Sequence, residues 1–228
     1  MSNICVNGDS YTQELYLEPQ YRWTNHIGVT DNLALGGGSN DRIFYTTIEY
    51  LNHNSPDILL IGWTTISRGM LSNINGSRIV VTIGHTFDEN LGGNCNEYSK
   101  FYFKNCYNGF VNFKNTLEYM IHLQEYCKIK NIKLWYYNAM LPSLDEKKLL
   151  AIASEAYMIR SDENIERQGI KHNLNILKNL INKLNKDIWI KRIWYSIPEH
   201  CKDFPTESGG HPDIAGSAHW AELIKQYV

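Results

Sequence analysis

The stretch Ile4-Cys5-Val6-Asn7-Gly8-Asp9-Ser10 decides how the rest of this sequence is interpreted. It begins with apolar, β-prone residues, which favour a buried strand. It then passes into Gly, Asp and Ser, which are common turn residues. A serine in such a turn lies at the carboxyl edge of a sheet, where open α/β sheets bind ligands. The same tripeptide also occurs in ordinary turns, so its meaning depends on the rest of the chain.

The composition is that of a globular protein with a sizeable core, since 43% of the 228 residues are hydrophobic and 12% are aromatic. The formal net charge of -2 provides no general attraction to nucleic acid or to anionic membranes, and we expect neither as a partner. The N-terminus lacks the basic start and apolar core of a signal peptide, which predicts a cytoplasmic protein. The five cysteines are scattered without a Cys-x-x-Cys pair, which indicates reduced thiols rather than a zinc site or disulfide framework.

Strands and helices are predicted to alternate along the chain. Hydrophobic patterning predicts strands at 3–7, 31–35, 57–62, 78–84, 132–138 and 188–196. It predicts helices at 21–28, 41–52, 109–130, 143–158, 162–185 and 213–227. This alternation predicts one three-layer α/β/α domain with a doubly wound, mainly parallel sheet, as in flavodoxin-like folds.

Residues 63–107 interrupt the alternation. The first part of this segment is polar and irregular, and the second is rich in Gly, Asn and aromatic residues without a clear period. We expect an insertion over the sheet edge, of the kind that shapes a binding site. The aromatic stretch 98–107 would either line a sugar or acyl site or pack the insertion against the domain.

A second group of residues suited to catalysis, Gly209-Gly210-His211-Pro212-Asp213, precedes the last predicted helix. A serine hydroxyl is a weak nucleophile until a base takes its proton, and histidine is the usual base. Ser10 and His211 are candidates for these two roles. The turn Gly36-Gly37-Gly38, before a predicted helix, offers backbone N–H groups for a developing oxyanion.

Taken in order, these residues resemble the sequence blocks of the SGNH, or GDSL-type, hydrolase superfamily. Gly8-Asp9-Ser10 resembles its first block, and Asn32 to Gly38 resembles its second, with Gly37 at the oxyanion-hole glycine. Gly62-Trp63-Thr64-Thr65 stands where the third block would be, and His211-Pro212 matches the fifth. The pattern also resembles a tailed-phage branch of these proteins.

The resemblance spans residues 3–224 and implies a serine esterase that needs no metal or organic cofactor. Ser10 would be the nucleophile and His211 the base. The oxyanion would be held by Ser10 N–H, Gly37 N–H and Thr64. The substrate implied is an O-acyl ester on a carbohydrate or another small polar molecule.

The third and fifth blocks depart from the family pattern. Thr64 replaces the family asparagine, which removes an amide donor that the Thr64 hydroxyl would have to supply. Ser208 stands at the position of the family acid, and Glu207 lies one residue further back. Either Glu207 or a backbone carbonyl orients the imidazole, and the second case leaves a Ser–His dyad.

Further residues near these blocks have alternative interpretations. Asn40 is a candidate substrate ligand or a helix cap, and Trp63 is a candidate substrate platform or a core residue. Arg68 would meet an anionic group or, as we favour, remain solvated. Asp9 is expected to tie the turn beneath Ser10 through backbone hydrogen bonds. His85 and His200 have no partner at metal-ligand spacing.

Two other functions remain open from the sequence. The altered blocks are compatible with a catalytically weak or inactive module, for example a phage component that recognises a glycan. A nucleotide-binding flavodoxin-like domain is a third hypothesis, in which Gly36 to Asn40 would hold a phosphate. The chain lacks both Gly-Lys-Ser/Thr and Gly-x-Gly-x-x-Gly, so this hypothesis ranks last.

Overall fold

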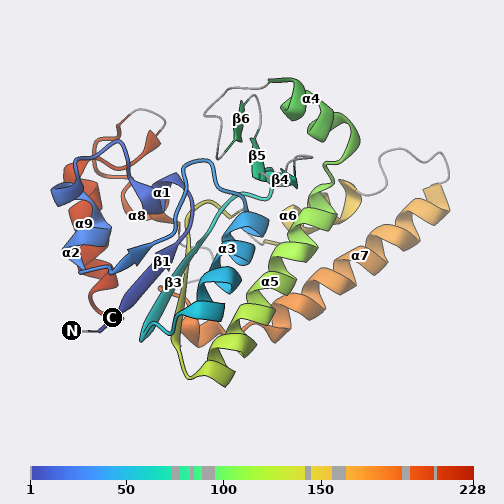
Figure 1. Ribbon diagram of the computed structural model, residues 1–228. Helices are drawn as coiled ribbons and strands as arrows, with labels where there is room; N and C mark the ends of the chain where they lie inside the picture. Colours follow the sequence, from blue (N-terminus) through green and yellow to red (C-terminus); the bar gives the residue numbers. More distant parts are fainter. Residues whose placement is uncertain are drawn as a thin grey trace.

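A parallel four-stranded sheet forms the centre of the protein (Figure 1). The structure is a computed structural model, and it describes residues 2–72, 78–82, 85–88, 96–141, 145–155, 163–191, 196–207 and 210–228. The strands are β1 (Ile4–Asn7), β2 (Asp31–Asn32), β3 (Ile58–Trp63) and β7 (Lys133–Asn138). Their spatial order is β2-β1-β3-β7, and every neighbouring pair is parallel. The connection after β1 leads to β2 on one side of β1, and the connection after β2 leads to β3 on the other side. The carboxyl end of β1 is therefore a topological switch point, where α/β proteins place their ligands.

Helices cover both faces of this sheet. The helices in the described residues are α1 (Ser10–Gln13), α2 (Trp23–His26), α3 (Asn40–His53), α4 (Asn96–Asn105), α5 (Gly109–Lys130), α6 (Glu146–Ser154), α7 (Glu163–Lys183), α8 (Ile197–His200) and α9 (Ile214–Ile224), with 3-10 turns at Pro19–Tyr21 and Lys186–Ile188. Of these, α4 packs against a small second sheet within residues 63–107 and not against the central one. Helices α3, α5 and α7 lie on one side of the sheet, and α1, α2, α8 and α9 lie on the other (Figure 1). The predicted three-layer α/β/α fold is confirmed.

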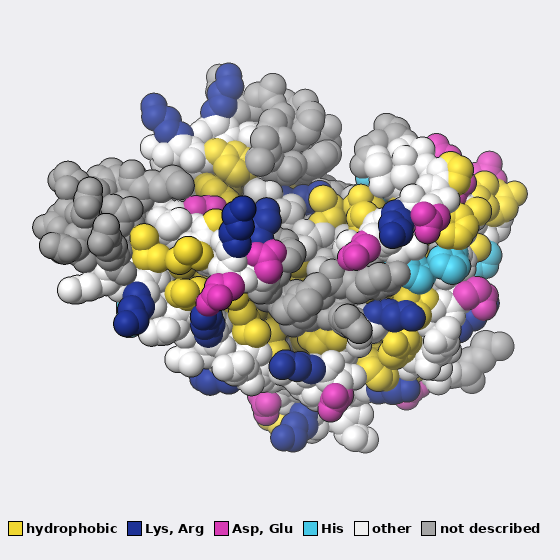
Figure 2. Space-filling model, turned by 180° about the vertical axis from the view of Figure 1, so that it is seen from behind, with side chains coloured by type: hydrophobic (Ala, Val, Ile, Leu, Met, Phe, Trp, Pro, Cys, Tyr) yellow, Lys and Arg dark blue, Asp and Glu magenta, His cyan; other side chains and the backbone are white. Residues whose placement is uncertain are grey.

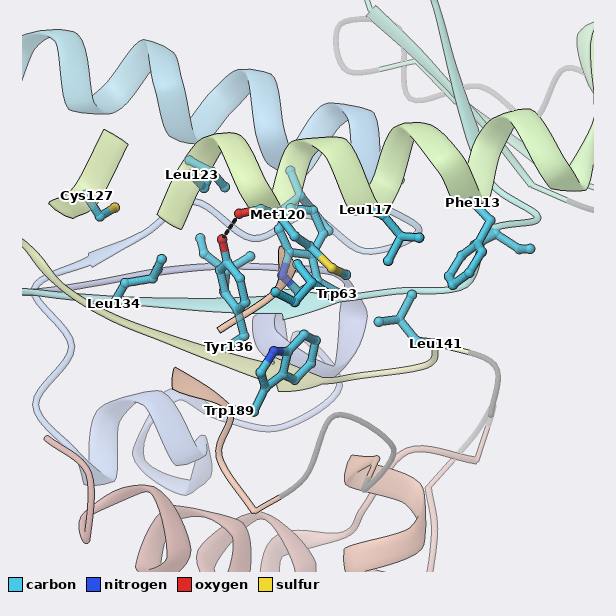
Figure 3. Packing of buried hydrophobic residues seen from close by; sticks show 14 of the residues in the cluster. Trp63, Phe113, Leu117, Met120, Leu123, Cys127, Leu134, Tyr136, Leu141 and Trp189 are labelled. Carbon is cyan, nitrogen blue, oxygen red and sulfur yellow. Dashed lines mark hydrogen bonds between the residues drawn. The ribbon is translucent and has the colours of Figure 1, made fainter. Parts of the chain in front are cut away.

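Two hydrophobic clusters hold the layers together, one on each face of the sheet. The larger packs β3 and β7 against α3, α5, α6 and α7, and it contains Trp63, Phe113, Tyr136 and Trp189 (Figure 3). The Tyr136 ring packs edge-on against Trp63 and Trp189, with ring centroids 5.5 and 5.4 Å apart. Its hydroxyl donates to Met120 O over 2.7 Å, so the one polar atom of this buried ring is satisfied.

The second cluster packs β1 and the end of β7 against α1, α2 and α9. Here Tyr137 lies between Trp23 and Trp220, at 5.8 Å from each ring. The Tyr137 hydroxyl shares a hydrogen bond of 2.5 Å with Thr12 Oγ1. This contact joins the first helical turn after β1 to the neighbouring part of the sheet.

A separate three-stranded antiparallel sheet lies within residues 63–107. It consists of β4 (Gly69–Ser72), β5 (Arg78–Thr82) and β6 (His85–Asp88), in that spatial order. The strand predicted at 78–84 therefore belongs to this small sheet and not to the central one. Helix α4 was not predicted, because its sequence has no apolar period that stands out from the surrounding Asn and Tyr residues. That this segment is an insertion into a single domain stays a prediction.

Two predicted strands of the central sheet differ in the structure, one being shorter and the other replaced, in its described part, by isolated bridges. The strand predicted at 31–35 is regular only at Asp31–Asn32, although Leu33 N and Leu35 N still donate to Val6 O and Gly8 O. In place of the strand predicted at 188–196, Trp189 and Ser196 form isolated parallel bridges to Tyr136 and Asn138. Residues 192–195 lie outside the described part of the chain.

The surface carries no single-signed field on the face seen in Figure 2, where Lys and Arg are intermixed with Asp and Glu. This matches the small net charge of the chain. No helix within the described ranges is long and apolar enough to cross a membrane.

Candidate active site

The turn after β1 brings the first chemical groups to the sheet edge. Gly8 is required there, because a Cβ atom at this position would lie 2.1 Å from Thr12 Oγ1 and 3.3 Å from Gly62 O. The chain then enters α1 at once, with Asp9 as its N-cap. Ser10 is the first residue of that helix, so its side chain is half-buried at the carboxyl edge of the sheet.

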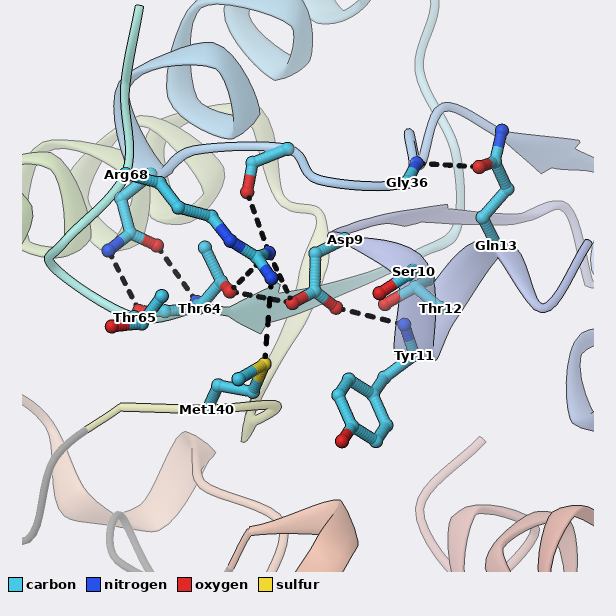
Figure 4. Close-up of polar contacts among 12 residues, drawn as sticks. Asp9, Ser10, Tyr11, Thr12, Gln13, Gly36, Thr64, Thr65, Arg68 and Met140 are labelled. Carbon is cyan, nitrogen blue, oxygen red and sulfur yellow. Dashed lines mark hydrogen bonds and ion pairs between the residues drawn. The ribbon is translucent and has the colours of Figure 1, made fainter. Parts of the chain in front are cut away.

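The Asp9 carboxylate joins three segments beneath Ser10 (Figure 4). Its Oδ1 accepts a hydrogen bond from Tyr11 N at 3.0 Å, as the sequence predicts. Its Oδ2 accepts from Thr64 Oγ1 at 2.6 Å and from Arg68 Nη1 at 3.0 Å. Asp9 is fully buried, so these donors stabilise a charge that water does not reach.

Ser10 and His211 meet as the sequence predicts, although they are 201 residues apart. His211 Nε2 lies 2.8 Å from Ser10 Oγ, which is hydrogen-bond distance for proton transfer. Both side chains are half-buried and therefore partly reachable by a ligand. The Asp213 side chain caps α9 by accepting from Gly216 N, which fixes the start of the helix just after His211.

Two tyrosine rings pack against the His211 ring. The centroids of Tyr11 and Tyr16 each lie 4.6 Å from the imidazole centroid, with interplanar angles of 37° and 38°. The Tyr11 hydroxyl also donates to Gly210 O at 3.3 Å. The sequence pattern did not indicate Tyr16, because it lies in the irregular segment after α1 where no periodicity selects a side chain.

The glycine turn before α3 lies against the Ser10 turn. Leu35 N donates to Gly8 O at 3.2 Å, and a Cβ atom at Gly36 would lie 3.9 Å from Ser10 Cβ. Gly36 N donates to Gln13 Oε1 at 2.5 Å, which ties this turn to α1. Gly37 has a φ of +75°, a conformation that favours glycine. Among the described residues, the N–H groups of Ser10 and Gly37 have no hydrogen-bond partner.

Thr64 is close to the site, but both of its donors are used within the protein. Its hydroxyl donates to Asp9, and its N–H donates to Asn40 Oδ1 at 2.8 Å. A hydroxyl has a single proton, so Thr64 does not supply an oxyanion donor in this arrangement. The expected replacement of the family asparagine by the Thr64 hydroxyl is therefore not what the structure shows.

Asn40 and Trp63 do not face a ligand. Asn40 is 4% exposed, and its Nδ2 donates to Thr64 O at 2.9 Å and to Thr116 Oγ1 at 3.2 Å. Its amide therefore holds the end of β3 rather than a substrate. Trp63 is fully buried in the larger cluster, so the core interpretation is correct and the substrate-platform interpretation is wrong.

Arg68 is not the solvated arginine that we favoured. Its side chain is 12% exposed, and Nη1 also contacts Gly38 O at 3.3 Å and Thr64 Oγ1 at 3.0 Å. The anionic group that it meets is Asp9. The spacing in sequence did not show this, because four residues of irregular chain after β3 bring the guanidinium back over the sheet edge.

The Glu207 carboxylate does not contact the imidazole. Glu207 is exposed, and within the described ranges its side chain makes no hydrogen bond or ion pair. Its backbone N–H instead donates to His211 O at 2.8 Å. Residues 208–209, which include the position of the family acid, lie outside the described part of the chain.

A second buried acid, Glu14, lies behind the site. It ends α1 in a left-handed conformation with φ of 49°, and its Oε2 accepts from Trp23 N at 2.7 Å. Burial raises the pKa of Glu14 to about 8, and its hydrogen bonds to Ser217 and Trp23 together with the Arg22 charge oppose the rise only in part. The side chain is 1% exposed.

The remaining histidines do not form a metal site in the described residues, where no group of three or more His, Cys, Asp or Glu side chains is arranged to hold an ion. His200 stacks on His219, with ring centroids 4.5 Å apart. Burial and the neighbouring His219 lower the pKa of His200. The side chain of His85 lies outside the described part.

Comparisons with known proteins give low similarities. No protein-family model matches the chain, and no curated protein matches it. Solved structures that resemble it include TesA (TM-score 0.49, 10% identity, 99% of this chain and 97% of that one) and the esterase EstA from Pseudoalteromonas sp. (TM-score 0.49, 8% identity, 100% and 96%). Another is a GDSL-like lipase from Bacteroides thetaiotaomicron (TM-score 0.46, 16% identity, 99% and 86%).

Replacing Arg68 with Ala should destabilise the protein strongly, because Asp9 would keep a buried charge without its counter-ion. Breaking a buried pair in this way costs about 3–5 kcal/mol of unfolding free energy. Urea denaturation followed by circular dichroism measures the change. Adding Asp9→Asn to Arg68→Ala should recover part of the loss, because the unpaired charge is removed.

Lys178→Ala is the matched control, since it breaks the exposed Lys178–Glu146 pair of 2.9 Å. Exposed pairs contribute roughly 0–1 kcal/mol. An Arg68→Ala protein as stable as Lys178→Ala would contradict the structural role of the buried pair.

The stability of the protein should fall as pH rises from about 4.5 to about 8, because over this window Glu14 ionises in the unfolded chain while it keeps its proton in the folded protein. A carboxyl whose folded pKa is raised binds a proton more tightly in the folded state, so its contribution is intact at low pH and is lost above the unfolded pKa. Glu14→Gln should remove this dependence and unfold at higher urea at pH 8 than the wild type. Equal pH slopes in both proteins would show that Glu14 does not carry the effect, and Glu125→Gln, at an exposed position, serves as control.

Proposed function

We propose that this protein is a serine esterase in which Ser10 is the nucleophile and His211 the general base. The observation that carries the proposal is the 2.8 Å contact between Ser10 Oγ and His211 Nε2 at the switch point of the sheet. Residue order adds support, since the serine follows the first strand and the histidine precedes the last helix. The resemblance to SGNH hydrolases points to the same chemistry.

In the proposed reaction, Ser10 Oγ attacks the acyl carbonyl while His211 Nε2 takes its proton. The oxyanion of the tetrahedral intermediate is held by the N–H groups of Ser10 and Gly37, which have no partner among the described residues. His211 then gives its proton to the leaving alkoxide, and an acyl-enzyme remains on Ser10. Water activated by the same imidazole releases the acid and restores the serine.

The proposed substrate is an O-acyl ester on a carbohydrate or another small polar molecule. Ser10 is partly exposed, so the carbonyl of such an ester can reach its hydroxyl. The oxyanion hole has no side-chain donor from Thr64 or Asn40, because these donors are used within the protein. A missing donor typically lowers the rate by about 10²–10³-fold, so we expect a slow enzyme.

Ser10→Ala and His211→Ala should each lower hydrolysis of p-nitrophenyl acetate by roughly 10³-fold or more, and the double variant should be little worse than either. The reason is that nucleophile and base act as one unit. A fluorophosphonate probe should label the wild type and fail to label Ser10→Ala. Ser154→Ala and the exposed His172→Ala are matched controls. Full activity in either active-site variant, with wild-type folding by circular dichroism, would exclude this mechanism.

Glu207→Gln should lower kcat by less than about tenfold, because its carboxylate is exposed and does not contact the imidazole. Loss of an acid that orients the histidine would instead cost about 10⁴-fold. Steady-state kinetics on the same ester, beside His211→Ala, distinguish the two cases. A folded Glu207→Gln protein as inactive as His211→Ala would mean that Glu207 turns toward the ring in the working enzyme.

A protein that binds an ester without hydrolysing it is the second candidate, favoured by the missing third donor. In that case the wild type would bind acetylated sugars in calorimetry, while the probe would leave Ser10 unlabelled. Turnover of the ester panel that depends on Ser10 would exclude this alternative.

A further inference from the structure

We propose that the aromatic rings of Tyr11 and Tyr16 position the His211 imidazole and stabilise its protonated form during catalysis. The inference rests on the proposed function and adds two positioning residues to it. Its basis is that both rings pack against the imidazole at the same centroid distance, 4.6 Å. This separation lies in the range of about 4.5–7 Å over which aromatic rings attract one another.

Tyr11 is held in place by burial and by two hydrogen bonds. It follows Ser10 in α1, is 6% exposed and belongs to the same hydrophobic cluster as Trp23. Its carbonyl accepts from Trp23 Nε1 at 3.0 Å, and its hydroxyl donates to Gly210 O at 3.3 Å. Tyr11 therefore contacts both proposed catalytic residues. Ser10 precedes it in the chain, and the His211 segment meets its ring and its hydroxyl.

Tyr16 is brought to the imidazole by the turn that ends α1. Glu14 takes the left-handed conformation there, and Leu17 N donates to Glu14 O at 3.0 Å. Arg22 Nε then donates to Leu17 O at 3.0 Å, which closes the segment against the start of α2. A chain segment without regular secondary structure is thus held at both ends, and its central tyrosine lies against the catalytic histidine.

The ring of Tyr16, and not its hydroxyl, carries the contact. Within the described ranges the Tyr16 hydroxyl is buried and has no hydrogen-bond partner. A buried hydroxyl without a partner destabilises the folded state, so packing of the ring is the contribution that remains. Substituting phenylalanine should therefore preserve the contact and remove a source of instability.

Aromatic faces suit the base of a serine hydrolase for two reasons. Packing restricts rotation of the imidazole, which keeps Nε2 aligned with Ser10 Oγ. The π-face is negative and attracts the positive imidazolium that forms when His211 takes the serine proton. The two rings act on the imidazole from positions that the fold of α1 and the following turn sets, beside the contact of Nε2 with Ser10 Oγ.

The test compares Tyr16→Phe with Tyr16→Leu, because the first keeps the ring and the second removes it. Tyr16→Leu should lower kcat by about 10- to 100-fold with KM within about twofold, since the base is misaligned while the substrate contacts remain. Tyr16→Phe should keep wild-type kcat and melt at a higher temperature. The exposed Tyr45→Leu controls for loss of a tyrosine elsewhere. Tyr16→Met, which is unbranched and lacks a ring, replaces Tyr16→Leu if that protein does not fold, with the same loss expected.

NMR of the His211 ring protons gives a readout that does not depend on turnover. The two tyrosine rings should shift these signals by their ring currents, and the shift should persist in Tyr16→Phe and shrink in Tyr16→Leu. Wild-type kcat in folded Tyr16→Leu, or equal losses in the Phe and Leu variants, would overturn the inference. Activity that survives Ser10→Ala would instead overturn the proposed function, while the NMR shifts would still report whether the rings hold the imidazole.

Discussion

The site depends on one buried charge, the Asp9 carboxylate at the end of β1. It receives hydrogen bonds from the first turn of α1, from the Thr64 side chain after β3 and from Arg68 beyond it. Placing a carboxylate out of contact with water is costly, and only well-aligned donors offset that cost. Ser10 is the next residue in the chain. The hydrogen bonds that stabilise the buried Asp9 carboxylate therefore also fix the backbone that carries the Ser10 hydroxyl.

The same contacts occupy Thr64, which the sequence indicated as an oxyanion donor. Its hydroxyl donates to Asp9 and is not directed at a ligand. The amide at this sheet edge belongs to Asn40, and it binds the backbone of Thr64 on both its N–H and its carbonyl oxygen. Polar groups here support one another and leave the backbone N–H groups of Ser10 and Gly37 for a ligand. These contacts fix the polar side chains at the sheet edge to one another, so a ligand at Ser10 would meet backbone N–H groups and not the Thr64 or Asn40 side chains.

The sequence predicted the parts of this protein that depend on short-range pattern. The apolar run of β3, the long helix α5 and the Gly-Asp-Ser and Gly-His-Pro motifs were placed correctly, because burial on two faces, helical periodicity and turn chemistry all act locally. The sequence did not predict the positions of side chains that are set by contacts between distant segments of the chain. Arg68 and Thr64 looked like loop residues until the fold brought them to Asp9, and Tyr16 gave no signal because irregular chain has no period. Of the small sheet, the sequence predicted the strand at β5 but not its partners β4 and β6.

The distance between Ser10 and His211 is best explained by a closed path of packing. From Ser10 the chain runs through α1 to Glu14, whose carboxyl group binds the start of α2 at Trp23. Helix α2 packs against α9, and Trp23 and Trp220 of these helices contact the same Tyr137 ring. Helix α9 begins two residues after Pro212 and so holds His211 from the other side. The side chains that join the elements of this path, Glu14, Trp23, Tyr137 and Trp220, are buried, and close-packed interiors do not deform gradually. Ser10 and His211 are thus held at a fixed separation by the core between α1, α2 and α9, and the rings of Tyr11 and Tyr16 restrict the remaining rotation of the imidazole.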